Sequence, residues 1–180
     1  MNLKLKTGNY LAFSGVRWKA FLISDIAEII SGHGIVEDER IPGRIPYVTS
    51  SFRNNGVTDF LGNTNATLES ECISVNSNGS VGYAFYHPYK ALYSIDCRKL
   101  RPKHRNKYTS IFIAASITLQ RRKYSYGYKM GTARLKRQKI MLPVNEDDEP
   151  DYAFMERFMR QTERRLINRY NQYKYILGGG

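Results

Sequence analysis

The sequence contains few of the residues from which metal centres and disulfide frameworks are built. Its 180 residues include two cysteines, Cys72 and Cys97, and three histidines, and none of them forms a cluster with the spacing of a zinc site. Both cysteines lie in apolar, strand-like segments, so we expect buried free thiols in a reducing compartment. No apolar run approaches the roughly 20 residues of a membrane helix, and the amino terminus lacks a signal-peptide core. We therefore expect a cytoplasmic protein that makes no use of a membrane.

Motifs of common catalytic sites are also missing from the sequence. It has no phosphate-binding glycine loop followed by a lysine, no glycine-flanked nucleophilic serine and no Asn-Pro-Pro-aromatic motif of the kind that amino-methyltransferases use. Acidic residues gather at 37–39 and 146–149, but both groups lie in polar turns without the spacing of a nuclease metal site. We therefore expect a protein that is not an enzyme and needs no cofactor.

Acidic residues are absent from one long basic segment. Residues 98–139 carry fourteen of the 28 lysines and arginines and no aspartate or glutamate, in a chain of net charge +12. Tyrosines are interleaved with these charges, most densely at 123–129. Such a segment attracts polyanions, above all nucleic acid, whereas a solubilising surface usually mixes both signs of charge. The pattern favours nucleic-acid binding, and because tyrosines also stack on unpaired bases, the ligand is either duplex DNA or RNA.

Hydrophobic periodicity predicts a mixed, mostly β globular domain that begins near Trp18. Asp25, with Glu28 three residues further on, predicts a short capped helix through residue 30. Strands separated by polar turns are expected at 44–49, 71–75, 81–86, 91–95 and 140–144. Together with the helices described next, these elements predict an α+β fold.

A second helix should begin at Asn106 and run to about Gln120. Its apolar residues Ile111, Ala115 and Leu119 fall four apart, so we expect them to share the buried face, which Phe112 broadens.

A third, much longer helix should be capped by Asp151 and run to about Leu177, which gives it a length of roughly 40 Å. Its apolar stripe consists of Met155, Met159, Leu166, Tyr170, Tyr173 and Ile176 or Leu177. The stripe is narrow, which is typical of one partner in a helix pair or coiled coil. The alternative is that the helix packs back along its own domain.

Seven blocks of sequence, in this order and spacing, resemble the Type I restriction–modification DNA specificity domain. They are 43–49, 55–57, 80–89, 100–103, 123–129, 134–143 and 150–155. The polar, glycine-containing start of the chain, residues 1–17, is expected to be a lead-in segment. The resemblance implies a target recognition domain at 18–149 that reads one half of a split DNA site, and a helical spacer at 150–180. It also implies that methyltransferase subunits carry S-adenosylmethionine and the chemistry, that a restriction subunit cleaves, and that this chain supplies specificity.

The chain departs from the family pattern in one respect. A typical specificity subunit has two recognition domains and two helical spacers, and this sequence has one of each. We expect either a half-size subunit whose two copies pair through antiparallel 151–177 helices, or a part of a longer subunit. A recognition region of a fused Type II restriction–methylation enzyme is an alternative, as is a helix-mediated structural protein.

Two polar loops and the basic segment supply the candidate DNA contacts. Hydroxyl, amide and guanidinium groups can read base edges, although Asn and Ser in such turns often bond only to their own backbone. The candidates for base reading are Ser51, Arg53, Asn54, Asn78 and Tyr126. The candidates for phosphate contact are Lys123, Lys129, Arg134, Lys136 and Arg137.

Overall fold

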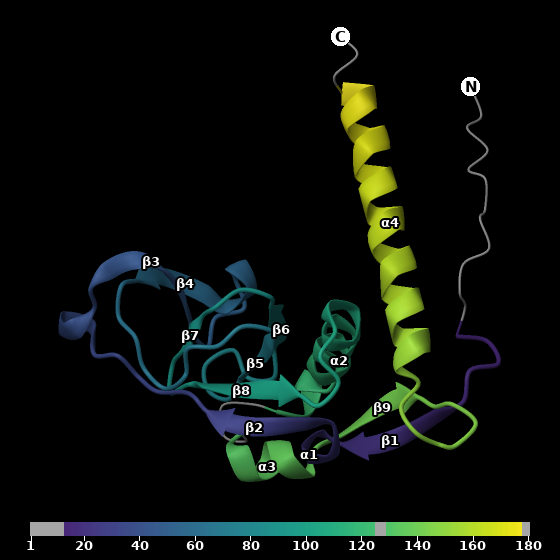
Figure 1. The fold of residues 1–180 in the computed structure, drawn as a ribbon, viewed down its shortest axis with the longest axis horizontal. Coiled ribbons are helices and arrows are strands. Elements are labelled where there is room, and N and C mark those ends of the chain that lie inside the picture. The colour runs from purple at the N-terminus through teal and green to yellow at the C-terminus, as the bar shows by residue number, and fades with distance from the viewer. Residues whose placement is uncertain (1–12, 125–128, 178–180) are drawn as a thin grey trace.

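The structure is a computed structural model that describes residues 13–124 and 129–177, and Figure 1 shows a β-rich body from which one long helix projects. The strands are β1 (Trp18–Leu22), β2 (Ala27–Ser31), β3 (Pro42–Val48), β4 (Val57–Leu61), β5 (Cys72–Asn76), β6 (Ala84–His87), β7 (Leu92–Tyr93), β8 (Cys97–Pro102) and β9 (Lys139–Pro143). The helices are α1 (Ile23–Ile26), α2 (Lys107–Leu119), α3 (Thr132–Arg137) and α4 (Tyr152–Leu177), with single 3-10 turns η1 (Glu37–Glu39), η2 (Asn54–Gly56) and η3 (Arg121–Lys123). The predicted α+β class is confirmed.

The strands form two sheets and one separate pair. Four antiparallel strands lie in the order β2-β8-β5-β6, and a smaller sheet has the order β4-β3-β7 with β3 and β7 parallel. Strand β1 pairs with β9 in antiparallel register from Trp18 opposite Pro143 to Leu22 opposite Lys139. This pair brings the start of the domain to the base of α4 (Figure 1).

Two buried clusters hold these layers together. In the larger one, Ile73 and Leu100 of the four-stranded sheet pack with Ile113 of α2. In the smaller one, the fully buried Cys72 and Cys97 lie with residues of the three-stranded sheet. Both cysteines are free, so the prediction of buried thiols is confirmed.

The predicted strands are confirmed in place but not in every boundary. Strands β3, β5 and β9 lie within two residues of the expected limits. Strand β6 begins at Ala84 rather than at residue 81, because Gly82 has a φ of 84° and forms a turn. Strand β7 spans two residues where five were expected.

The expected helix at 25–30 is wrong for most of its length. Helix α1 ends at Ile26, and β2 follows at once and pairs with β8. The predicted cap is also wrong, because Leu22 occupies the N-cap position without a side-chain bond. The β-branched Ile29 and Ile30 suit a strand, and pairing with β8 outweighs the local capping pattern.

Helix α2 forms where it was predicted, and Phe112 is buried as expected, but the rest of its buried face is different. Asn106 caps it by accepting hydrogen bonds from the amides of the next turn. Leu119, expected in the core, is 79 % exposed, whereas Thr109, Ile113 and Ile117 are buried. The true stripe is displaced by two residues, which is about half a turn. The helix is apolar around most of its surface, so its periodicity does not identify the inner face.

Helix α4 begins as predicted, because Asp151 Oδ1 accepts a hydrogen bond of 2.8 Å from the amide of Phe154. Its first turns pack on the body: Met155 is fully buried, and Phe158 stacks on Phe13 with a centroid distance of 4.7 Å. Among the residues described, no helix is both long and apolar enough to cross a bilayer.

Candidate nucleic-acid interface

The two polar loops that carry Ser51, Arg53, Asn54 and Asn78 touch each other. Loop A (49–56) follows β3, and loop B (76–80) begins at Asn76, the last residue of β5. The side-chain amide of Asn76 donates a hydrogen bond of 2.9 Å to the carbonyl of Ser51, and the Ser50 hydroxyl donates to a carbonyl of loop B. Residues about 25 positions apart in the sequence therefore share one surface.

Two hydrogen bonds to Asp96 anchor loop B. The side-chain amide of Asn78 donates to the Asp96 carboxylate at 2.9 Å, and the Ser77 hydroxyl donates to the Asp96 carbonyl at 2.7 Å. Asn78 is half-buried. Its amide is therefore oriented by Asp96, which leaves fewer of its hydrogen-bonding positions for a base than a free amide would have.

Loop A has an unusual backbone that fixes the position of its tip. Asn54, Asn55 and Gly56 have φ values of 49°, 53° and 83°, in the left-handed region that Asn and Gly tolerate best. The Gly56 amide donates to the Arg53 carbonyl at 2.8 Å, and the Arg53 amide donates to the Ser51 hydroxyl at 3.1 Å. The side chains of Arg53 and Asn54 are exposed. The four described base-reading candidates thus lie on two contacting loops.

The turn η3 joins the same surface. Its first residue, Arg121, places its guanidinium 4.8 Å from the centroid of the Tyr83 ring. Gly82 approaches closely, since a Cβ added there would lie 2.8 Å from the Arg121 Cβ. Lys123, a phosphate candidate, is exposed in the same turn. The turn that carries Lys123 is therefore joined to loop A through Arg121, Tyr83 and Phe52.

The other phosphate candidates lie around α3, which the sequence did not predict and which packs against α1 and β2. At its start, Arg98 Nε donates to the Thr132 hydroxyl at 2.8 Å, and at its end the Ser24 hydroxyl donates to the Lys136 carbonyl at 3.1 Å. The start of α3 therefore lies beside the start of β8, at the same end of the four-stranded sheet as loop B. The other end of α3 lies beside α1.

Two of the α3 candidates, Lys136 and Arg137, are exposed, and Arg134 is half-buried with its guanidinium donating to the Lys129 carbonyl at 2.7 Å. Lys129 is exposed. These four basic residues therefore lie in α3 or just before it, whereas Lys123 lies in η3. The remaining candidate, Tyr126, lies outside the described residues.

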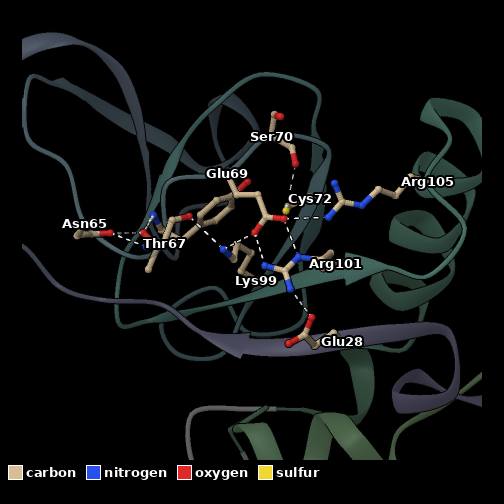
Figure 2. A network of polar contacts seen from close by, with 10 residues as sticks. Glu28, Asn65, Thr67, Glu69, Ser70, Cys72, Lys99, Arg101 and Arg105 are labelled. Atoms are coloured by element: carbon tan, nitrogen blue, oxygen red, sulfur yellow. Dashed lines mark hydrogen bonds and ion pairs between the residues drawn. The ribbon is translucent and has the colours of Figure 1, made fainter.

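A buried ion-pair network uses several charges of the basic segment. Figure 2 shows the Glu69 carboxylate surrounded by Lys99, Arg101 and Arg105. Their nitrogens lie 2.7, 2.6 and 3.0 Å from its oxygens, respectively, and Arg101 also donates to Glu28 on β2. Lys99 is 1 % exposed, although lysine is rarely buried unless it is paired. These hydrogen bonds, with the one from Arg101 the strongest, lower the pKa of Glu69 to about 2 despite its burial.

The network corrects the expectation of one continuous basic surface. Glu69 and Glu28 come from elsewhere in the sequence and neutralise part of the 98–107 stretch, and Lys107 pairs with Glu163 of α4 at 2.6 Å. Sequence reasoning missed Glu69 because nothing local marks it as a partner of residues thirty positions away. Positive charge remains at η3 and α3 instead.

No metal-binding arrangement accompanies these loops. Within residues 13–124 and 129–177, no group of three or more His, Cys, Asp or Glu side chains is placed to hold an ion. The most buried histidine, His87, bonds to the Ser74 hydroxyl at 2.9 Å, and burial lowers its pKa to about 4.

Comparisons with known proteins connect this geometry to a family. A family model described as the Type I restriction modification DNA specificity domain matches residues 15–172. The specificity subunit of a type II restriction enzyme from Heyndrickxia coagulans is 40 % identical over 154 residues, which is 84 % of this chain and 45 % of that protein.

Solved structures of specificity subunits share the fold. The S subunit of a type I system from M. genitalium has a TM-score of 0.63 at 19 % identity, covering 93 % of this chain and 43 % of that one. The HsdS subunit of Thermoanaerobacter tengcongensis has a TM-score of 0.59 at 11 % identity, covering 84 % and 38 %. The chain thus spans less than half the length of these relatives. It belongs to the Type I restriction–modification DNA specificity domain family.

Proposed function

We propose that this chain is a sequence-specific DNA recognition module of a restriction–modification specificity subunit. The observation that carries the proposal is the contact between loops A and B, which gathers base-reading side chains beside the cationic turn η3. Membership of a DNA specificity family supports duplex DNA over RNA as the ligand, and over a purely structural role.

The roles of the side chains follow from their chemistry. Arginine reads guanine through two hydrogen bonds and asparagine reads adenine in the same way, so Arg53, Asn54, Asn78 and the Ser51 hydroxyl are assigned to base edges. Cations contact phosphates and position the module on the duplex. Those assigned to phosphates are Lys123, Lys129, Arg134, Lys136 and Arg137.

The reaction itself belongs to partner subunits in this proposal. Methyltransferase subunits supply S-adenosylmethionine and methyl transfer, a restriction subunit supplies cleavage, and the chain directs both without catalysing either step. The family model is of type I systems, and one relative is the specificity subunit of a type II enzyme, so the proposed division of roles applies to either type of system.

The proposal divides the chain into a recognition domain at 18–149 and a helical region at 150–180. Beyond Glu163 the side chains of α4 are exposed as far as Lys174, among them Leu166 and Tyr170. A second copy, or a second helix of a longer subunit, covers this stripe by antiparallel pairing. Two copies would read an inverted repeat, because the symmetry of the assembly is repeated in its site.

The test is to sequence modified bases in cells that express this chain with its cognate methyltransferase subunit. We expect one modified motif that appears when both proteins are present and changes in the Arg53→Ala variant. A genome without a modified motif, or a motif that forms without this chain, would overturn the proposal.

A further inference from the structure

Four side chains form a continuous row across the candidate interface. Arg53 lies over the Phe52 ring at 5.7 Å, the Phe52 and Tyr83 centroids are 5.9 Å apart, and Arg121 lies over the Tyr83 ring at 4.8 Å. We call Arg53, Phe52, Tyr83 and Arg121 the aromatic row. Its members come from loop A, the segment before β6 and η3, and each end of the row carries a guanidinium group.

Phe52 is the exposed apolar member of this row. It is 54 % exposed at the tip of loop A, whereas Tyr83 is half-buried and has Phe85 behind it at 6.2 Å in a nearly parallel stack. Burial of a phenylalanine ring stabilises a fold, and Phe52 forgoes about half of that contribution here. Single exposed apolar residues are common on protein surfaces, but this one is flanked by cations on a surface with base-reading groups.

The row is held in place by backbone features. Gly82 has a φ of 84°, and its contact with Arg121 leaves no space for a side chain. On the other side, the left-handed residues Asn54 and Asn55 fix the turn that follows Arg53. A preorganised group loses little conformational entropy on binding.

We propose that Phe52 makes an apolar contact with the DNA bases while Arg121 contacts the adjacent phosphate. This inference rests on the proposed function and adds two contacts to it. An aromatic ring can pack against the C5-methyl group of thymine or against the face of a partly unstacked base. The Arg121 guanidinium at the η3 end of the row complements the phosphate that borders either contact, and Arg53 at the other end stays assigned to a base edge.

The test is selection of bound sequences from a randomised duplex pool with the purified chain and its methyltransferase subunit. Phe60 provides a matched control because it is 55 % exposed on β4 and stands outside the row. We expect Phe52→Ala to lose or change the preference at one or two neighbouring base pairs, and Phe60→Ala to select the same motif as the unaltered chain. An unchanged motif and affinity for Phe52→Ala would overturn the inference.

Two further arms identify the source of the apolar contact. If Phe52 packs on a thymine methyl, uracil in place of that thymine weakens binding by about 5-fold or more, and Phe52→Leu restores the preference. If it packs on a base face, uracil has little effect and Phe52→Leu resembles Phe52→Ala.

Arg121→Ala should weaken the binding of all DNA sequences alike and reduce the salt dependence of the affinity. Arg169→Ala, on the exposed part of α4, should have neither effect. Equal effects of the two variants would contradict the phosphate contact of Arg121.

The two proposals fail in different ways. If the unaltered chain enriches no motif, the proposed function falls and this inference falls with it. If it enriches a motif that Phe52 does not affect, this inference alone is wrong.

Discussion

Arg53 and Asn54 extend their side chains into solvent at the tip of loop A, whereas Asn76 joins loop A to loop B and Asp96 anchors loop B. The exposed pair can bond to a ligand without breaking a contact of the fold. Asn76 and Asp96 affect recognition only indirectly, because they fix the positions of loop A and loop B, respectively. Substitution of an exposed residue should therefore change recognition with little effect on stability.

Arg53→Ala and Lys129→Ala should have different effects on DNA binding. Loss of Arg53 should remove about 1–3 kcal/mol of discrimination at one base pair, because a side chain that reads a base edge is lost. Loss of Lys129 should weaken all sequences alike and lower the slope of log affinity against log salt by about one. Titrations of matched and mismatched duplexes at several salt concentrations measure both effects. The reverse pattern would contradict the two assignments.

Glu69→Gln should destabilise the fold strongly. It leaves Lys99 buried without its carboxylate, and breaking a buried ion pair in this way costs about 3–5 kcal/mol. Urea unfolding monitored by circular dichroism measures the change, and the exposed neighbour provides the control, since Glu71→Gln should be nearly neutral. Equal stability of the two variants would show that the network contributes little.

The same carboxylate predicts a dependence of stability on pH. The pKa of Glu69 is lowered from 4.5 to about 2, so between these values the unfolded chain binds more protons than the folded one. The stabilisation is present above pH 4.5 and is lost as the pH falls toward 2. The Glu69→Gln variant should lack this part of the acid dependence.

The chemical types of these residues could be predicted from the sequence, but not which of them are exposed to a ligand and which hold the loops in place. Asn76 and Asn78 lie in one polar stretch and look equivalent, yet Asn76 is fully buried and bonds to loop A while Asn78 is half-buried beside Asp96. That difference depends on partners about 20 residues away. Phe52 and Arg121 were missed for the same reason, since the row exists only after three segments meet.

Helix α4 consists of a packed part and an exposed part. In its first half, Glu163 accepts hydrogen bonds from Lys107 and from the Tyr108 hydroxyl, at 2.6 and 2.7 Å. Further along, Leu166 and Tyr170 are 58 % and 64 % exposed. The expectation that the helix packs along its own domain holds for the first part, and the second part is available to another helix.

Replacing both Leu166 and Tyr170 with Glu should abolish pairing through α4. The change puts two charges on the stripe, and buried unpaired charge is strongly unfavourable. Analytical ultracentrifugation should show the altered chain as a monomer at concentrations where the unaltered chain associates, and its thermal unfolding should be unchanged. Asn168→Glu with Gln172→Glu adds the same charge to the opposite face and should preserve association. A monomeric unaltered chain, with and without its methyltransferase subunit, would contradict the pairing.

Elements could be predicted wherever local signals and tertiary packing agree. The Asp151 cap and the long stripe located α4 to within a residue, and Asn106 located the start of α2. The helix expected at 25–30 failed because β8 offered a pairing partner that the local pattern does not reveal. Helix α3 was missed because six residues with three basic side chains show no clear apolar period.

At the scale of the whole molecule, the body that carries loops A and B is connected to α4 through the β1–β9 pair. Strand β1 pairs with β9 just before α4, and Arg17 forms an ion pair of 3.1 Å with Asp148 in the connecting turn. Phe13 and Trp18 pack nearby, with a centroid distance of 5.2 Å. The direction of α4 relative to the sheets is therefore set by these contacts, which suits the spacer role proposed for it.

The overall charge of +12 and the order of the sequence blocks predicted the class of protein, but not the distribution of its charge. Acids from distant strands neutralise the stretch around Lys99 and Arg101, and this pairing appears only in the folded chain. The cationic surface that remains lies at η3 and α3, beside and beyond the reading loops.

The most direct measurement is the affinity of the purified chain, with its methyltransferase subunit, for a selected duplex, a duplex with one mismatch and a single-stranded RNA of the same sequence, at rising salt. We predict that the selected duplex binds about 5- to 150-fold more tightly than the mismatched one, equivalent to about 1–3 kcal/mol, that the RNA binds more weakly, and that salt weakens binding throughout. Equal affinity for all three ligands, or no binding to either duplex, would contradict the account.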